Sequence, residues 1–375
     1  MTIFRRLIYQ EVVGAVAFVS LGFLALFFFF DLLDEMRSVG RIPGYTLSYA
    51  LMAVVLEIPN HLYELLPITV LIGTIFVMAR LAQNSEFTIM RVSGMGPWLA
   101  LRTMVVLGLA FVMLTGVIGD YLAPAADRLA LQAQSKYLGR SKSAGSTGAW
   151  LKERVDGRTI AVNASTVDAN GRLQWVRIFE FDPSGRMLQQ IHAARAQVQP
   201  DSGHWDLSEV RRSRFSYGGD ASADHAHATV DVQQEHLPEL RYPSSITGDM
   251  MLAAVHKPAH MPMLELWRFA QHLKANDQSA QKYEIEFWRK VFYPLSCLVM
   301  VVLALPFAYL HFRSGGIASY VFGGIMAGIS FFLLNNVFSY AGNLQNWSPL
   351  WSAAAPGLIY SLLSLAAFGW LVVRQ

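Results

Sequence analysis

Six apolar stretches without a charged side chain, three on each side of a long polar segment, constrain this chain more than any other feature. They are Val12–Phe30, Leu65–Ala79, Thr103–Gly119, Val291–Leu310, Ile317–Tyr340 and Ala353–Val373, with about 170 residues between the third and the fourth. A helix crosses a bilayer core with about 20 apolar residues. The second and third stretches are shorter, and the second can be extended only upstream, through Glu64 and Glu57. The pattern predicts an integral membrane protein with an extramembrane domain inserted at its midpoint.

The composition agrees with a membrane protein and excludes several functional classes. Charged residues make up 15% of the chain, against about 25% in soluble domains. The net charge of +3 is too small to indicate a nucleic-acid partner. The single cysteine, Cys297, lies inside the fourth apolar stretch, so the chain has neither a disulfide framework nor a thiolate metal cluster.

The distribution of arginine predicts how the helices are oriented, because cytoplasmic loops carry an excess of Lys and Arg. With the N-terminus in the cytoplasm, the short outer loops hold only Arg37 and Arg41. The inside then holds seven arginines: Arg5, Arg6, Arg80, Arg91, Arg102, Arg313 and Arg374. The first stretch is too long for a signal peptide, and acidic residues follow it where a cleavage site is needed, so we expect a retained span. We predict six transmembrane helices, both termini in the cytoplasm and the central domain on the far face.

The central segment has the pattern of a β domain. Turn signals recur at four places, Asp168–Gly171, Asp182–Gly185, Pro200–Gly203 and Tyr217–Asp220. Between the first two, Leu173–Phe181 alternates apolar and polar residues as a half-buried strand does. Several strands at this spacing favour a sandwich or an open barrel. Helices at Ala125–Tyr137 and Leu264–Ala275 are expected to join this domain to the membrane.

These patterns divide the chain into three parts. Residues 1–124 hold the first three transmembrane helices, residues 125–285 the β domain with its helical connectors, and residues 286–375 the last three helices. Alternation places Trp175, Ile178 or Phe179, and Phe181 on the interior face of the β domain. That face either holds lipid tails or forms the domain core, and the alternation favours the core.

Catalytic motifs are absent from the sequence. There is no Gly-Lys dipeptide and therefore no P-loop for nucleotide phosphates. The H-E-x-x-H and G-x-S-x-G motifs are missing too. The short tract Asp224–His227 is interpreted as a polar loop rather than a metal site. We expect a protein that is not an enzyme, holds no metal, and takes energy for any work from a partner.

The loop between the second and third stretches, at about residues 81–94, is predicted to contain a short helix. Asn84 or Ser85 is a suitable N-cap, Glu86 lies in the first turn, and Gly94 can end the helix. The loop also carries four apolar residues, Phe87, Ile89, Met90 and Val92. Two interpretations stay open. The helix lies flat on the bilayer, with Glu86 stabilised by the helix dipole, or it docks a cytoplasmic protein.

Two polar clusters lie at the outer ends of the first and second spans. After the first span, Arg37 and Arg41 serve either as interfacial anchors or as contacts to phosphate or carboxylate on a ligand. At the head of the second span, contact of Glu57 and Glu64 with lipid would cost much free energy. They predict either a polar vestibule or a kinked helix that lies half out of the bilayer.

Two parts of the chain carry a family resemblance. Leu65–Gly73 is followed by Leu81-Ala-Gln-Asn-Ser-Glu86 and Met90-Arg-Val-Ser-Gly94, and Tyr283–Leu295 is followed by Leu303–Phe307. In combination these motifs resemble the lipopolysaccharide-export permeases, the LptF/LptG family, and the resemblance covers nearly the whole chain. The opening Phe30-Asp-Leu-Leu and the loop before Gly94 are closer to the G-type than to the F-type subunit.

The resemblance implies a membrane α-helical permease with an inserted periplasmic β-jellyroll, in the inner membrane of a Gram-negative bacterium. Such a subunit extracts lipopolysaccharide without changing it chemically. The implied partners are a paralogous F-type permease, a dimeric LptB-type cytoplasmic ABC ATPase that binds ATP and Mg, and LptC/LptA-type periplasmic jellyroll proteins. Two other classes stay open: an ABC subunit that transmits motion without translocating lipid, and a membrane-anchored scaffold or sensor.

The resemblance also assigns candidate sites. Glu86 matches the acidic residue of the family's coupling helix, and we assign ATPase coupling to Glu86, Phe87, Met90 and Arg91. Arg37 and Arg41 fall where family members carry basic residues that face lipid A phosphates. Together with Trp175 and Phe181 they are the candidate substrate-binding residues.

Overall fold

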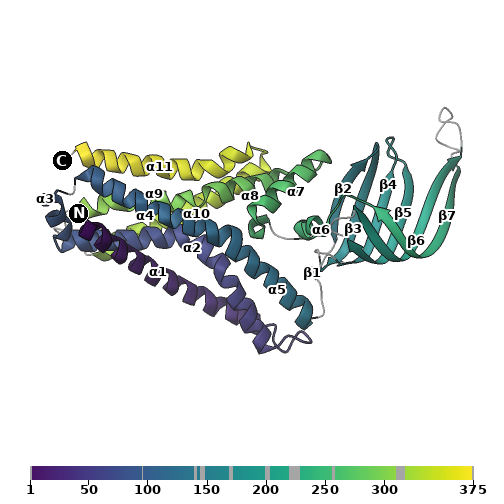
Figure 1. Ribbon diagram of the computed structural model, residues 1–375, viewed down its shortest axis with the longest axis horizontal. Coiled ribbons are helices and arrows are strands. Elements are labelled where there is room, and N and C mark those ends of the chain that lie inside the picture. The colour runs from purple at the N-terminus through teal and green to yellow at the C-terminus, as the bar shows by residue number, and fades with distance from the viewer. Residues whose placement is uncertain are drawn as a thin grey trace.

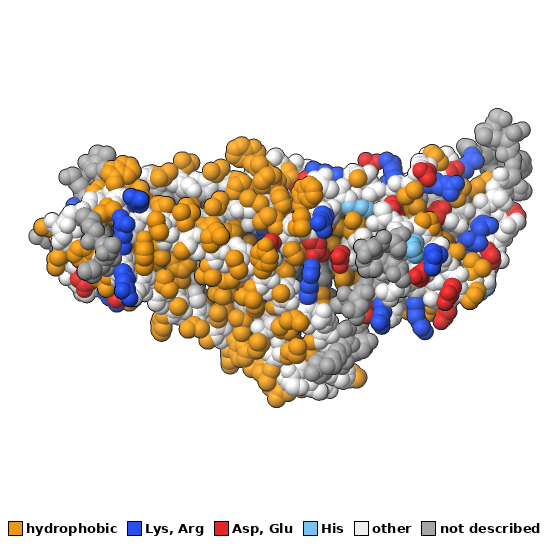
Figure 2. All heavy atoms as spheres, in the orientation of Figure 1, with side chains coloured by type: hydrophobic (Ala, Val, Ile, Leu, Met, Phe, Trp, Pro, Cys, Tyr) orange, Lys and Arg blue, Asp and Glu red, His pale blue; other side chains and the backbone are white. Residues whose placement is uncertain are grey.

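A computed structural model describes residues 2–94, 96–138, 142–143, 148–168, 172–198, 203–218, 229–255, 258–309 and 317–373. The molecule is elongated, with a bundle of long helices at one end and a curved β-sheet at the other (Figure 1). Apolar side chains cover the helical part, whereas charged ones gather at its two ends and over the sheet (Figure 2). Both termini and the short helix α3 lie at the end of the bundle far from the sheet (Figure 1).

The N-terminal half of the bundle is built from α1 (Thr2–Met36), α2 (Leu47–Gln83), α3 (Glu86–Val92) and α4 (Pro97–Val117), which continues through the π-helical turn η1 (Ile118–Leu122) into α5 (Ala123–Leu138). After the sheet come α6 (Gly248–Val255), the 3₁₀ turn η3 (Pro258–His260), α7 (Met263–Ala275), α8 (Gln281–Phe292), α9 (Leu295–Ala304), the 3₁₀ turn η4 (Leu305–Tyr309), α10 (Ile317–Leu344) and α11 (Pro349–Val373). Among the described residues, five helices are long and apolar enough to cross a membrane, and α8 with α9–η4 makes a sixth if this pair, bent by 47°, is one span. The membrane α-helical fold with an inserted β domain is confirmed.

Helix α2 is the central helix of the bundle, which explains its short apolar stretch. It packs against α1, α9 and α10, and its segment from Leu66 to Leu81 is largely buried. The stripe of α1 that faces it recurs every fourth residue, as on one side of a helix: Ile8, Val12, Val16 and Ser20. A Cβ atom on Gly73 would lie 2.8 Å from Val16, so glycine permits the close approach of α1 and α2. Protein surrounds much of α2 in place of lipid, so α2 tolerates the half-buried Glu57, whereas Glu64 remains exposed.

The π-helical turn η1 has a specific cause in the sequence. The N–H of Ala123 donates to the carbonyl of Ile118, five residues back. The next residue, Pro124, has no N–H to donate. The carbonyl of Gly119 is therefore left without its helical partner, and the buried Nζ of Lys290 on α8 donates to it at 3.0 Å. This bond ties the two halves of the bundle together at the point where α4 turns into the connector α5.

The inserted domain is a single antiparallel sheet. Its strands are β1 (Lys142–Ser143), β2 (Ala149–Val155), β3 (Arg158–Val167), β4 (Arg172–Phe181), β5 (Met187–Val198), β6 (His204–Gly218) and β7 (Thr229–Pro243). From β3 to β7 each strand pairs with the next in sequence, and both β1 and β2 pair with β3. The turn at Asp182–Gly185 forms as predicted, with the Gly185 N–H donating to the Asp182 carbonyl. Parts of the other three predicted turns lie outside the described residues.

One face of the sheet packs on the connector helices α6 and α7. Its core joins strand residues such as Val176, Ile178 and Trp205 to Leu266 and Phe269 of α7. The predicted helices at Ala125–Tyr137 and Leu264–Ala275 correspond to α5 and α7.

The prediction that Trp175 and Phe181 form the domain core is wrong. Leu173, Val176 and Ile178 are the buried apolar residues of β4, whereas Trp175 is 66% exposed and Phe181 is half-buried. Trp175 has a backbone φ of +53° and lies between the paired residues Gln174 and Val176, at an irregularity of the ladder. The buried positions of β4 pass from Leu173 to Val176 across this residue, so the alternation reverses there without a shift of register against β3. Phe181 follows the reversed alternation, because Ile178 and Glu180 are the buried positions beside it. The register shift between Glu180 and Phe181 places its extra residue, Leu188, on β5 and leaves the alternation of β4 unchanged.

Candidate functional site

The short helix α3 forms within the loop where the sequence predicts it, but its first turn differs from the prediction. Ser85 occupies the N-cap position with a φ of +60°, and its side chain makes no capping hydrogen bond. Asn84 instead donates from Nδ2 to Oε1 of Glu86 at 3.3 Å. Gly94 ends the segment with a φ of +100°, a conformation that favours glycine, and its N–H donates to the Arg91 carbonyl.

The inner face of α3 is anchored to η4, the turn that follows α9. Phe87 and Met90 are only 2% and 3% exposed. The Phe87 ring meets the Tyr309 ring edge to face, with 4.9 Å between the centroids. The Arg91 guanidinium carbon lies 5.0 Å from the Tyr309 ring centroid, within the range of a cation–π contact. Phe87, Met90 and Arg91 therefore hold α3 on the bundle, and Phe87 and Met90 are not exposed to a partner.

The outer face of α3 carries the exposed apolar residues. Ile89 is 60% and Val92 is 86% exposed, and Glu86 is half-buried beside them. Sequence reasoning grouped the apolar residues into one surface, whereas they form two. The spacing contains this signal, because positions 87 and 90 lie on one side of a helix and positions 89 and 92 on another.

A polar cluster links α1, α2, α5 and η3 at the end of the bundle nearer the sheet. His61 Nε2 of α2 lies 2.7 Å from Asp31 Oδ2 of α1. Asn60 of α2 donates to Asp127 Oδ1 of α5 at 2.8 Å, and His260 Nδ1 of η3 lies 2.9 Å from Asp127 Oδ2. These contacts join four elements that are far apart in the sequence.

A cleft of about 670 Å³ opens beside this cluster, and its charged lining is mostly acidic. Glu57 lines it, as the predicted vestibule requires, whereas Glu64 is exposed elsewhere and does not. The other ionisable groups of the lining are Glu35, Tyr49, Asp127, Arg128, Asp249, His260 and Glu265. Burial is the main cause that raises the pKa of Glu265, against the opposing effect of Arg128. So many carboxylates disfavour an anionic ligand in this cleft.

Arg37 and Arg41 lie in the turn that follows α1, outside the lining of that cleft. Arg37 Nη1 is 3.1 Å from Asp34 Oδ1, and both side chains are more than 70% exposed. Arg41 is also exposed. The structure leaves both arginines facing outward, where they can reach either lipid headgroups or a ligand.

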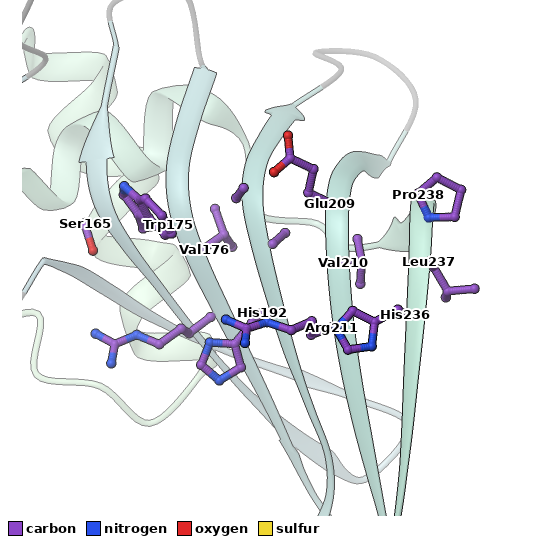
Figure 3. A pocket seen from close by; sticks show the side chains of 13 residues that line it. Ser165, Trp175, Val176, His192, Glu209, Val210, Arg211, His236, Leu237 and Pro238 are labelled. Carbon is purple, nitrogen blue, oxygen red and sulfur yellow. The ribbon is translucent and has the colours of Figure 1, made fainter.

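Trp175 and Phe181 are separated in the sheet. Trp175 lines a second cleft, of about 790 Å³, on the sheet (Figure 3), and Phe181 does not. Among the described residues no group of three or more His, Cys, Asp or Glu side chains could hold a metal ion. The tract Asp224–His227 lies outside the described residues.

Comparisons with known proteins agree on one family. Residues 6–370 match the family model described as lipopolysaccharide export system permease LptF/LptG. The chain is 25% identical, over 99% of its length and 98% of the relative, to the lipopolysaccharide export system permease protein LptG of Haemophilus influenzae. It is 26% identical to the protein of the same name from Escherichia coli K12, over 91% of this chain and 90% of the relative.

Proposed function

The chain belongs to the LptF/LptG family of lipopolysaccharide export system permeases, and from this we propose that it works as the G-type subunit of an ABC transporter. It is a multi-pass inner-membrane protein and a transporter component rather than an enzyme. In the proposal it extracts lipopolysaccharide from the membrane, a cytoplasmic ATPase dimer supplies the energy, and a paralogous F-type permease forms the other half of the cavity. Both termini lie in the cytoplasm and the sheet domain lies in the periplasm.

The anchored helix α3 is the observation that carries this proposal. The chain has no P-loop of its own, yet α3 presents Ile89 and Val92 outward at the end of the molecule that holds both termini. Exposed apolar side chains on a short helix suit a docking contact. A displacement of α3 would reach Tyr309 directly through Phe87 and Arg91.

The rest of the transmission route runs through α9 and α8. Tyr309 ends η4, which continues α9, and the 47° bend joins α9 to α8. On α8, Lys290 contacts the Gly119 carbonyl in the turn that leads to α5 and then to the sheet domain. This chain of contacts supports mechanical coupling between the ATPase side and the periplasmic domain.

Helix α1 supports a role in lipid access. Its most apolar window is only 17% buried, compared with 72% for α2. Its outward side chains include Phe18, Leu21 and Phe29. Such a face suits a lateral opening toward lipid and the partner permease. Arg37 and Arg41 follow directly, at the depth where headgroup phosphates would pass, and the acidic cleft behind them does not suit those phosphates.

The test is reconstitution of the chain with a family ATPase and an F-type permease in liposomes that contain lipopolysaccharide. The chain alone should show no ATP hydrolysis, and the complex should show ATP-dependent transfer of lipopolysaccharide to a soluble jellyroll acceptor. A complex that hydrolyses ATP but retains no lipopolysaccharide after purification would indicate a subunit that transmits motion without moving lipid. Failure to associate with any ATPase would indicate a scaffold or sensor.

A further inference from the structure

One face of the sheet carries a row of four basic side chains. Arg177 of β4 is the direct cross-strand partner of His192 of β5, His192 is that of Arg211 of β6, and Arg211 is that of His236 of β7. Figure 3 shows His192, Arg211 and His236 in line across the strands. The residues that alternate with them, such as Val210, belong to the core shared with α6 and α7. The row therefore lies on the face turned away from those helices.

This row differs from other rows of the same sheet. Like charges directly opposite one another on neighbouring strands destabilise a sheet, and opposite charges stabilise it. Arg212 faces Glu235 with 2.5 Å between Nη2 and Oε2, and Arg241 faces Asp206 with 3.3 Å between Nε and Oδ1. The row through Arg211 contains no acid. A bound anion would supply the missing negative charge.

Arg177 is held in place for such an anion. Its Nε and Nη2 atoms donate to Oδ1 of Asn163, at 3.1 and 2.8 Å. Asn163 is fully buried, and its own Nδ2 donates to the Ala149 carbonyl. A guanidinium has five N–H donors, so three remain on Arg177. A side chain already fixed in one orientation loses less entropy when it binds a ligand.

The next row deepens the face into a cleft. Ser165, Trp175, Ala194, Glu209 and Pro238 are each passed over by the ladder pairing, one on each strand from β3 to β7. Trp175 and Glu209 have φ values of +53° and +55°, which cost free energy in residues other than glycine. The cleft of about 790 Å³ is lined by both rows, with the exposed Trp175 ring on its wall. Glu209, the only acid among the described residues of the lining, lies 3.8 Å from Arg195.

We propose that this cleft binds a phosphate group of a phosphorylated glycolipid, with Arg177 and Arg211 holding the anion and Trp175 stacking on an adjacent sugar ring. The proposal rests on the proposed function, because lipopolysaccharide is the transported molecule that would bring phosphates and sugars to this domain. Arginine suits the role because its planar fork matches phosphate oxygens. The flat indole face suits the apolar C–H face of a sugar. The site adds a polar contact to a domain whose predicted role concerned acyl chains.

The test uses the full chain in the reconstituted complex, with photoreactive benzoylphenylalanine at Ser165, on the wall of the cleft. The site variant is Arg177→Gln/Arg211→Gln. The control is Arg172→Gln/Arg214→Gln, which removes the same charge from the same two strands outside the cleft lining. Hydrogen bonds to charged groups predict a loss of about tenfold per arginine. Adducts of lipopolysaccharide at Ser165 should fall by at least that factor in the site variant and stay unchanged in the control.

Three further arms identify the ligand. Enzymatically dephosphorylated lipopolysaccharide should give wild-type protein the low yield of the site variant. Inorganic pyrophosphate should compete with native lipopolysaccharide. If phosphatidylglycerol vesicles compete and pyrophosphate does not, the site binds membrane headgroups instead. Equal adducts in both double variants, or with dephosphorylated lipopolysaccharide, would overturn the proposal.

Two further measurements distinguish failure of the cleft proposal from failure of the proposed function and from a purely structural role of Arg211. If ATP-dependent transfer to the acceptor persists in wild type without adducts at Ser165, only the cleft proposal fails, whereas absence of transfer contradicts the proposed function itself. Arg211→Gln alone should also raise the thermal stability of the ligand-free chain in mild acid, where it removes a positive charge opposite a protonated His192. A lowered stability would indicate that Arg211 serves the fold.

Discussion

The buried amine of Lys290 on α8 donates to the carbonyl oxygen of Gly119 at 3.0 Å, across 171 residues of sequence. That carbonyl lacks a helical partner because Pro124 has no N–H, so one proline and one lysine cooperate at a π-helical turn. The contact joins the two halves of the bundle close to the entry of the sheet domain.

Replacing this lysine should destabilise the bundle. Lys290→Met leaves a buried carbonyl unpaired, which costs about 1–3 kcal/mol, and the melting temperature in detergent should fall. Lys282→Met, at an exposed position of the same helix, should have almost no effect. Pro124→Ala restores an N–H to the turn, so the double variant Lys290→Met/Pro124→Ala should lose less stability than the two single losses combined. Additive losses would show that the lysine and the proline act independently.

Substitutions on the exposed face of α3 should show whether this helix docks the ATPase or lies on the bilayer. Ile89→Asp/Val92→Asp changes the two outward apolar residues and leaves Phe87 and Met90 buried. We expect normal membrane insertion and melting temperature, with loss of the ATPase during affinity purification. Ser93→Asp, just beyond the helix, should retain the ATPase. Normal ATPase recovery with the double variant would support a helix that only rests on the membrane surface.

Glu86 provides an electrostatic test of the same contact. If it pairs with a cation on the ATPase, Glu86→Lys should abolish stimulated ATP hydrolysis while the chain still inserts. Asn84→Ala removes only the 3.3 Å hydrogen bond to Glu86 and should reduce coupling slightly. A role confined to the helix dipole is worth about 0.3–1 kcal/mol. If Glu86→Lys retained full coupling, the helix-dipole role would be the only one left for Glu86.

Substitution of Arg37 and Arg41 should show whether these arginines contact the ligand or anchor the chain at the membrane interface. The pair of Arg37 with Asp34 is exposed, and such pairs contribute about 0–1 kcal/mol, so Arg37→Glu/Arg41→Glu should fold. As phosphate contacts, the two changes should abolish lipopolysaccharide cross-linking near α1 and leave ATPase assembly intact. Asp34→Asn, which releases Arg37, should not reduce cross-linking. Lower membrane yield with unchanged cross-linking would identify interfacial anchors.

The sheet domain should become less stable in mild acid through His192. Burial, with the charges of Arg211 on β6 and Arg177 on β4, lowers the pKa of His192 below its ordinary value. Just below that value, about pH 6.5, the unfolded chain binds more protons than the folded one, so stability falls as the pH decreases through this window. Proteolysis of the sheet domain in the full chain, followed between pH 7.5 and 5.5, should show the trend. His192→Gln should weaken it, and an unchanged trend would assign it to another group.

Several features followed from local sequence because they depend on local chemistry. The six apolar stretches predicted the membrane helices, since long runs of uncharged, apolar residues have few other environments. The turn at Asp182–Gly185 and the alternation around Ile178 predicted strands, and the loop before Gly94 predicted α3. The family resemblance followed from the motifs around Glu86 and Trp288, and the comparisons confirm it.

The tertiary structure decided which side chains are buried and which meet. Period-two alternation assigned Trp175 and Phe181 to the core, but the alternation of β4 reverses at Trp175, in a row that the neighbouring strands also pass over in their pairing. Phe87 is buried on the bundle because Tyr309, more than 200 positions away, lies against it. The row from Arg177 to His236 exists only through the register of four strands. Sequence patterns determine elements, whereas contacts between distant residues require the packed fold.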